Sequence, residues 1–256
     1  MCIDTLGAGP VGCSVNPTVG RARIPVPTPK VRPGTKVIVA GAGPAGLTAA
    51  RELARAGAQV TIVGGEDEVG GQMADAARMK STPDFHRFLD WSLKEFERLG
   101  VSVQLGSPAD AASVAAAHAD AVVIATGGIA PQVSLQSVDA MPVMDVREWL
   151  NSHDLSEAPA ACTIWGVDGV GMSVADSLAD RGTSVLLIGA EREIAPDSGR
   201  RAKILAIPRL RDKPAVRIHL NTTVKALKKR LIHIDAVVCR HVGEAEGGRA
   251  LSGRCR

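Results

Sequence analysis

An internal repeat constrains the fold of this chain more than any other sequence feature. Shifting the sequence by 125 residues aligns two segments without a gap, so that Gly41 falls on Gly166 and Glu66 falls on Glu191. The aligned positions include turn glycines, one face of a predicted helix and part of the strand after it: Gly46, Ala50, Leu53, Ala54, Gly57, Val60 and Gly64. A chance match would not keep these features in phase. We therefore predict two copies of one supersecondary unit, with the second domain beginning near Ala161.

Each copy begins with the pattern of a strand, a helix and a second strand. In the first copy, the apolar run 37–40 ends at a glycine-rich turn, as a buried parallel strand does. Residues 44–56 place apolar side chains on one helical face, Gly57 ends that helix, and 59–63 forms the next strand. This order predicts an α/β fold that starts with a βαβ unit.

The remaining segments are predicted from periodicity. Residues 83–99 form a helix whose phenylalanine stripe faces the core rather than a cofactor pocket. Strands are expected at 101–105, at 121–125 as a buried strand, and at 235–239, where the strand closes the second domain. The basic run from Lys225 to Arg230 is expected to be a solvated turn.

The segment Gly41-Ala42-Gly43-Pro44-Ala45-Gly46 follows a predicted strand and opens a predicted helix. In that context a G-x-G-x-x-G sequence indicates dinucleotide binding. Gly41 permits the tight turn, Gly43 lets the backbone approach a pyrophosphate, and Gly46 lets the helix pack closely on the strand. The N–H groups and the macrodipole of the helix then hold the phosphate charge. The alternative is a glycine-rich turn without a ligand.

Both copies depart from the ideal dinucleotide pattern. In the first, Glu66 lies two residues beyond the position of the acid that binds the ribose, so it either reaches the ribose or is an exposed loop residue. In the second, Asp168 replaces the middle glycine and adds bulk and negative charge beside a pyrophosphate. Arg192, after Glu191, either pairs with a 2′-phosphate or is solvated. These features disfavour NAD(P)H binding and leave a packing role and a cofactor role open for the second domain.

Composition excludes several other classes of protein. The 256 residues carry a net charge of +3, no long basic stripe, three Phe, three Trp and no Tyr, which disfavours a nucleic-acid surface. No apolar run approaches the roughly 20 residues that span a bilayer, and the first residues lack the features of a signal peptide. Five cysteines without scaffold spacing fit a reducing compartment. We therefore expect a cytoplasmic protein with no nucleic-acid or membrane partner.

Three further segments complete a resemblance to a known family. Gly70-Gly71-Gln72 follows the second strand, and Asp120 to Gly128 is a strand that ends in a small-residue turn. In this order they resemble the flavoprotein disulfide-reductase class. Cys13-Ser14-Val15-Asn16-Pro17, the proline-rich linker and the first glycine-rich motif together resemble the trimethylamine dehydrogenase and 2,4-dienoyl-CoA reductase family of iron–sulfur flavoproteins.

This resemblance implies two Rossmann-like nucleotide-binding domains, the second inserted in the first, with an incomplete C-terminal return. It implies a Cys- and Pro-rich arm at 1–35, an FAD-binding domain at 36–160, an NAD(P)-binding-like domain at 161–240 and a tail at 241–256. FAD, or ADP alone, would lie against Gly41, Gly43, Pro44, Ala45, Gly46, Glu66, Gly71, Gln72, Ala125, Thr126 and Gly127. The corresponding residues of the second domain are Gly166, Gly171 and Glu191.

The resemblance also implies partners. In that family a flavin-bearing barrel precedes a 4Fe-4S cluster held by four cysteines, and Cys2 and Cys13 stand where the last two would stand. The C-x-x-C pair and the barrel are missing, and two thiolates do not hold a cubane cluster. The two cysteines are therefore remnants, half of a site that another polypeptide completes, or inert thiols. The implied function is electron transfer between NAD(P)H or an acceptor and a partner flavin or iron–sulfur centre within an oligomer. The alternative is a non-catalytic nucleotide-binding or structural subunit, and no catalytic residue is identified.

Overall fold

The computed structural model describes residues 12–13, 15–16, 19–20, 30–79, 82, 84–128, 136–138, 143–152, 158–196, 198–228 and 231–236. The predictions for Cys2, for most of the 1–35 arm and for the 241–256 tail lie outside these residues. The chain divides into an N-terminal unit, Gly12–Ala130, and a C-terminal unit that contains Pro131–Arg256 together with Met1–Val11. Both units have the mixed α/β architecture with parallel sheets that the sequence predicts.

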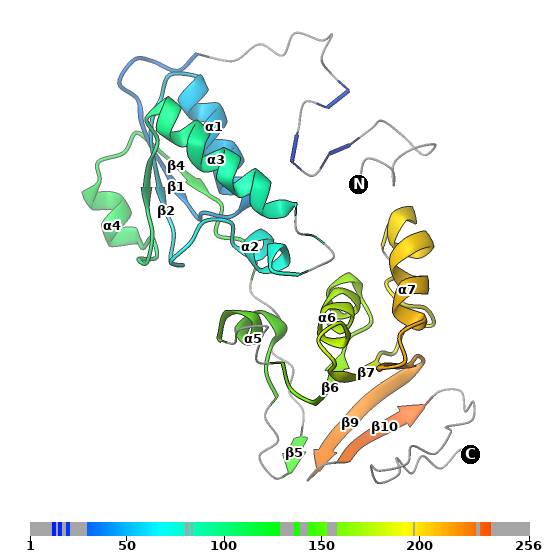
Figure 1. Cartoon of the computed structure of the whole chain (residues 1–256). Coiled ribbons are helices and arrows are strands. Elements are labelled where there is room, and N and C mark those ends of the chain that lie inside the picture. The colour runs from blue at the N-terminus through cyan, green and yellow to red at the C-terminus, as the bar shows by residue number, and fades with distance from the viewer. Residues whose placement is uncertain are drawn as a thin grey trace. The chain divides into compact units, whose positions relative to one another are not determined.

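The N-terminal unit is built on a parallel sheet of β1 (Lys36–Ala40), β2 (Gln59–Val63), β3 (Ser102–Gln104) and β4 (Ala121–Ile124). The strand order is β3-β2-β1-β4. The helices are α1 (Pro44–Arg55), α2 (Gln72–Ala77), α3 (Phe85–Leu99) and α4 (Ala111–Ala116). Figure 1 shows α1 and α3 side by side over one face of this sheet and α4 on the other side.

The core of the N-terminal unit lies between the sheet and the helices α1 and α3. Alternate residues of β1 and β2 face these helices, and Val39 and Ile62 are fully buried there. From α3, Leu89 and Phe96 join the same cluster, with Phe88 partly buried beside them. The predicted core-facing stripe of this helix is therefore confirmed.

Strand β4 is not buried as the sequence analysis predicted. Val123 packs against the core, but Val122 is 42% exposed and Ile124 is 81% exposed. In the described residues β4 pairs with β1 alone and forms one edge of the sheet. An apolar run predicts burial on both faces, whereas in β4 only Val123, on the face toward α1 and α3, packs against the core.

The C-terminal unit repeats the same beginning. Its parallel sheet has the order β6-β7-β8, with β6 (Ala161–Trp165), β7 (Ser184–Ile188) and β8 (Val216–His219). Helix α6 (Gly169–Ala179) joins β6 to β7, and a π-helix (Ala202–Ala206) runs into α7 (Ile207–Arg211) before β8. Helix α5 (Val146–Ser152) precedes β6.

A second sheet in the C-terminal unit has the order β10-β9-β5. Strand β9 (Thr222–Lys228) is antiparallel to β10 (Leu231–Ala236) and parallel to β5 (Gln136–Val138). Lys225 and Lys228 therefore lie in a strand, and the predicted solvated turn over this basic run is wrong for them. Charge alone predicted the turn, but pairing with β10 places the segment in a sheet.

The repeat is confirmed at the level of individual backbone bonds. The bounds of β1 and β6, and those of β2 and β7, differ by the same shift as the sequence repeat. The Gly41 N–H donates to Val63 O at 2.7 Å, and the Gly166 N–H donates to Ile188 O at 2.9 Å. Both units therefore present a glycine-rich turn at the carboxyl end of their first strand.

Candidate nucleotide-binding site

The glycine-rich loop of the N-terminal unit connects β1 to α1 and is shaped by two close approaches. Gly41 has a φ of +112°, and a Cβ at this position would overlap the carbonyl of Ala125 at the end of β4. A Cβ at Gly46 would overlap the carbonyl oxygen of Gly41. Glycine is therefore required at both positions to bring strand, loop and helix together.

Gly43 differs because its surroundings leave room. It is the N-cap of α1 in an extended conformation, and an added Cβ would meet no described atom within 4 Å. Pro44 occupies the first helical turn, where its missing N–H costs nothing. No side chain of the described residues caps this helix, so the N–H groups of Ala45 and Gly46 remain available with the positive end of the dipole. A diphosphate fits such an open helix end.

The loop after β2 lies against the same glycine-rich loop. The Gly70 N–H donates to Ala42 O at 2.8 Å. A Cβ on Gly71 would lie 3.4 Å from the Cα of Gly43 and 3.8 Å from Oε2 of Glu66. The exposed Glu66 carboxylate therefore stands beside the loop, although it lies two residues beyond the usual position of the acid.

The sheet order explains why these segments meet. Helices α1 and α3 lead from β1 outward to β3, whereas β4 lies on the other side of β1, so the chain reverses direction between β1 and β4. Ligands of open α/β sheets bind at the carboxyl ends of strands at this reversal. The structure gathers seven of the predicted residues there, namely Gly41, Gly43, Gly46, Glu66, Gly71, Ala125 and Thr126. Ala45, Gln72 and Gly127 are exposed on the adjoining segments.

The corresponding loop of the C-terminal unit has a similar backbone but a different residue at the N-cap of its helix. Gly166 has a φ of +131°, and a Cβ on Gly171 would overlap the Gly166 carbonyl oxygen. Asp168 is the N-cap of α6, and its Oδ1 accepts a hydrogen bond from the Gly171 N–H at 2.8 Å. The loop sequence predicted only bulk and negative charge at Asp168 and did not reveal this cap. The preference of N-caps for aspartate is the signal that would have found it.

Glu191 aligns with Glu66 in the repeat and lies next to Gly189, whose Cβ position also meets Val167 of the second loop. It is exposed, and its Oε2 lies 2.6 Å from the point that a Cβ of Gly189 would occupy. Its backbone carbonyl accepts from the Asn221 N–H at 2.9 Å. Gly166, Gly171 and Glu191 are thus placed around one loop.

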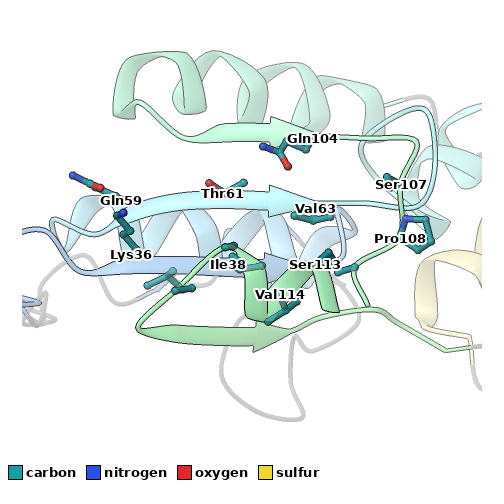
Figure 2. A pocket seen from close by; sticks show the side chains of 14 residues that line it. Lys36, Ile38, Gln59, Thr61, Val63, Gln104, Ser107, Pro108, Ser113 and Val114 are labelled. Atoms are coloured by element: carbon teal, nitrogen blue, oxygen red, sulfur yellow. The ribbon is translucent and has the colours of Figure 1, made fainter. Parts of the chain in front are cut away.

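A cavity of about 420 Å³ lies elsewhere in the N-terminal unit, between the sheet and α4. Figure 2 shows Ile38, Thr61 and Val63 of the sheet and Ser113 and Val114 of α4 around it. None of its lining residues belongs to the glycine-rich loop, and Lys36 is its one titratable group. We therefore place the candidate site at the loop, where donors and open space coincide.

The described residues show no group of three or more His, Cys, Asp and Glu side chains that could hold a metal ion. Cys13 is half-buried, and Cys2 lies outside the described residues. Burial raises the pKa of the half-buried Cys162 thiol in β6, which keeps this side chain in its unreactive protonated form. In the part of the chain that the structure describes, no helix is both long and apolar enough to cross a bilayer.

Comparison with known proteins identifies similar chains. The family model described as pyridine nucleotide-disulphide oxidoreductase matches residues 35–246. The NADH oxidase of Thermoanaerobacter brockii is 30% identical over 187 residues, which are 72% of this chain and 29% of that protein. The N,N-dimethylglycine/sarcosine dehydrogenase of Chromohalobacter salexigens is 32% identical over 209 residues, which are 73% of this chain and 28% of that protein.

A solved structure has a similar fold. A complex of 2-naphthoyl-CoA reductase matches 89% of this chain and 34% of its own with a TM-score of 0.80 and 25% identity. The chain thus spans between a quarter and about a third of the length of these proteins.

Proposed function

The chain belongs to the pyridine nucleotide-disulphide oxidoreductase family, and we propose that it is the FAD-binding electron-transfer module of a larger flavoenzyme. Its relatives support the resemblance to the trimethylamine dehydrogenase and 2,4-dienoyl-CoA reductase family. In this proposal electrons pass between NAD(P)H, or an acceptor, and a partner flavin or iron–sulfur centre. The observation that carries it is the uncapped, unobstructed N-terminus of α1 at Gly43.

The residues of the N-terminal unit fit the adenosine diphosphate part of FAD. The N–H groups of Ala45 and Gly46 would hold the diphosphate, and Gly43 would let it approach the backbone. The Glu66 carboxylate, which lies beside Gly71, would accept hydrogen bonds from a ribose. The flavin supplies the redox chemistry when bound, and the protein binds and orients it.

The aligned part of this chain spans less than a third of each relative's length, which supports a role for partner domains or subunits. The resemblance suggests a flavin-bearing barrel as the partner, in the cytoplasm and within an oligomer. A 4Fe-4S cluster would need cysteines from another polypeptide in addition to Cys2 and Cys13, since a cubane takes four ligands.

Flavin binding tests the proposal directly. The purified chain is incubated with FAD, passed through a desalting column and examined by visible absorbance. We expect a yellow protein with one FAD per chain. A protein that stays colourless, with a circular dichroism spectrum typical of a folded α/β domain, would contradict the proposal.

A second candidate is a non-catalytic subunit that binds FAD or ADP and docks on a partner. The capped loop at Asp168 favours it, because the family's second nucleotide would then have no open loop. Reduction of an artificial dye by the FAD-loaded chain separates the two candidates. Turnover with NADH or NADPH above that of free FAD supports the electron-transfer module, and FAD binding without such turnover supports the non-catalytic subunit.

A further inference from the structure

The two glycine-rich loops have matching backbones at the N-caps of their helices, where Gly43 of the first loop corresponds to Asp168 of the second. Gly43 has φ −77° and ψ 178°, and Asp168 has φ −69° and ψ −175°. The first hydrogen bond of each helix is also the same, from Leu47 N to Gly43 O at 2.9 Å and from Met172 N to Asp168 O at 3.0 Å. Of the residues that differ between the two loops, Asp168 is the one whose side chain caps a helix N–H group.

The Asp168 carboxylate stands where a phosphate would bind. Its Oδ1 lies 2.8 Å from Gly171 N, the donor that corresponds to Gly46 N in the first unit. Gly171 is buried, and the carboxylate also lies 3.5 Å from the point that a Cβ of Gly171 would occupy. A dinucleotide would have to displace an anion that already accepts a charge-assisted hydrogen bond at the positive end of α6.

We propose that Asp168 is a built-in substitute for the phosphate and that it closes the C-terminal unit to pyridine nucleotides. The residues of this loop therefore do not fit the second cofactor that the family name implies. The loop is closed mainly because the Asp168 carboxylate already accepts the hydrogen bond of the Gly171 N–H. Repulsion between this carboxylate and a phosphate adds to the effect. The inference concerns the C-terminal unit, so its nucleotide-binding test does not depend on flavin binding by the N-terminal unit, whereas the FAD measurement on Gly43→Asp rests on the proposed function.

Three variants separate occupancy from charge. Asp168→Gly removes the carboxylate and restores the G-x-G-x-x-G pattern, and it keeps the backbone because Gly43 adopts the same angles. Asp168→Asn removes the charge but leaves an amide oxygen that caps the same N–H. Gly43→Asp is the reciprocal change, placing a carboxylate within reach of Gly46 N where the loop has open space.

The experiment measures NADH and NADPH binding by isothermal titration calorimetry on the full chain. Each is titrated into Gly43→Asp, Gly43→Asp/Asp168→Gly and Gly43→Asp/Asp168→Asn, so that all three proteins carry a carboxylate at the first loop. We expect Asp168→Gly to bind one nucleotide per chain at least about tenfold more tightly than the other two proteins. We also expect Gly43→Asp alone to lower FAD affinity by about tenfold or more.

Several results would overturn the inference. If the protein that keeps Asp168 binds the nucleotide with a dissociation constant within about threefold of that of Asp168→Gly, the carboxylate does not close the loop. Equal increases in nucleotide affinity in Asp168→Asn and Asp168→Gly would show that charge alone excludes the ligand. If Asp168→Gly folds but binds the nucleotide no more tightly, Asp168 does not exclude the nucleotide. If Asp168→Gly does not fold, undiminished FAD affinity in Gly43→Asp would still refute the idea that a carboxylate at this position blocks a diphosphate.

Discussion

At the scale of single residues, the glycines of the first loop are needed for different reasons. Gly41 and Gly46 make room for neighbouring backbone, since a Cβ on either would overlap a carbonyl group. Gly43 adopts angles that any residue tolerates, and its Cβ position faces open space. Gly41 and Gly46 are therefore required by the fold, whereas Gly43 is not and leaves space for a ligand.

A substitution at Gly43 should separate binding from stability. We predict that Gly43→Ala lowers FAD affinity about tenfold or more, because the methyl group projects toward the diphosphate. Its cost in stability should be about 1 kcal/mol or less, the usual effect of a poorer N-cap. Calorimetric titration and thermal unfolding measure the two effects. Gly46→Ala is the control, and it should lower the melting temperature because its Cβ meets the Gly41 carbonyl.

At the scale of elements, an ion pair links α1 to α3 in the first unit and α6 to α7 in the second, and the signs of the charges are reversed between the units. Arg51 of α1 pairs with Glu95 of α3 at 3.6 Å. Position 51 corresponds to Asp176 of α6, which pairs with Arg209 of α7 and with Lys213 just beyond it, the latter at 2.6 Å. The repeat thus keeps the helix contact while exchanging the sign of the charge.

Two isoleucines of the first sheet should respond very differently to truncation. Ile62 of β2 is fully buried against the helices, whereas Ile124 of β4 is 81% exposed. We predict that Ile62→Ala lowers the free energy of unfolding by about 2–4 kcal/mol, because it leaves a cavity. Ile124→Ala should change it by less than about 0.5 kcal/mol. Urea unfolding of the two variants makes the comparison, and similar losses would mean that the exposed face of β4 is covered in solution.

The end of β8 should make stability depend on pH. Burial, and then the charge of Arg217, lower the pKa of His219 from its ordinary value of 6.5. His219 therefore binds a proton more readily in the unfolded chain than in the folded one. Its contribution to folding stability is fully present above pH 6.5 and declines as the pH falls below that value. We predict that His219→Gln reduces the loss of stability between about pH 7.5 and about pH 5.5. Urea unfolding at both values tests this, and an unchanged loss would rule out His219 as a contributor.

At the scale of the whole molecule, the chain holds two units of one design, each with its own buried cluster. The first centres on residues such as Val39, Ile62 and Phe96, and the second on residues such as Val185, Leu187 and Leu210. Their loops differ in whether the helix N-terminus is already occupied. The helix N-terminus of the first unit carries no side-chain cap, whereas in the second unit Asp168 caps the Gly171 N–H.

Hydrogen exchange should show this asymmetry directly. FAD at about 100 times its dissociation constant should stabilise the protein that binds it by about 2.7 kcal/mol. We predict slower exchange in peptides that contain Ala45 and Gly46 and no change in those that contain Val170 and Gly171. Mass spectrometry with and without FAD measures this. Equal protection of both loops would contradict a single open site.

Much of the fold was predictable because it depends on local patterns. The repeat predicted β1, α1 and β2 and their copies β6, α6 and β7 with bounds within one or two residues, since periodicity and turn glycines are written in the chain itself. Lys225 and Lys228 were misassigned because strand pairing with β10 is a contact between segments, which charge does not reveal. The burial of β4 was misjudged because an edge position is a property of the sheet.

The sequence by itself determined that this chain carries two nucleotide-type loops and which residues line them. Only the tertiary structure decided which loop is open. It set Glu66 beside Gly71, left the space at Gly43 free, and turned the Asp168 carboxylate onto the Gly171 N–H. The reason is physical: residue types fix the donors and charges available, but whether a donor is free depends on where neighbouring side chains lie once the chain has folded.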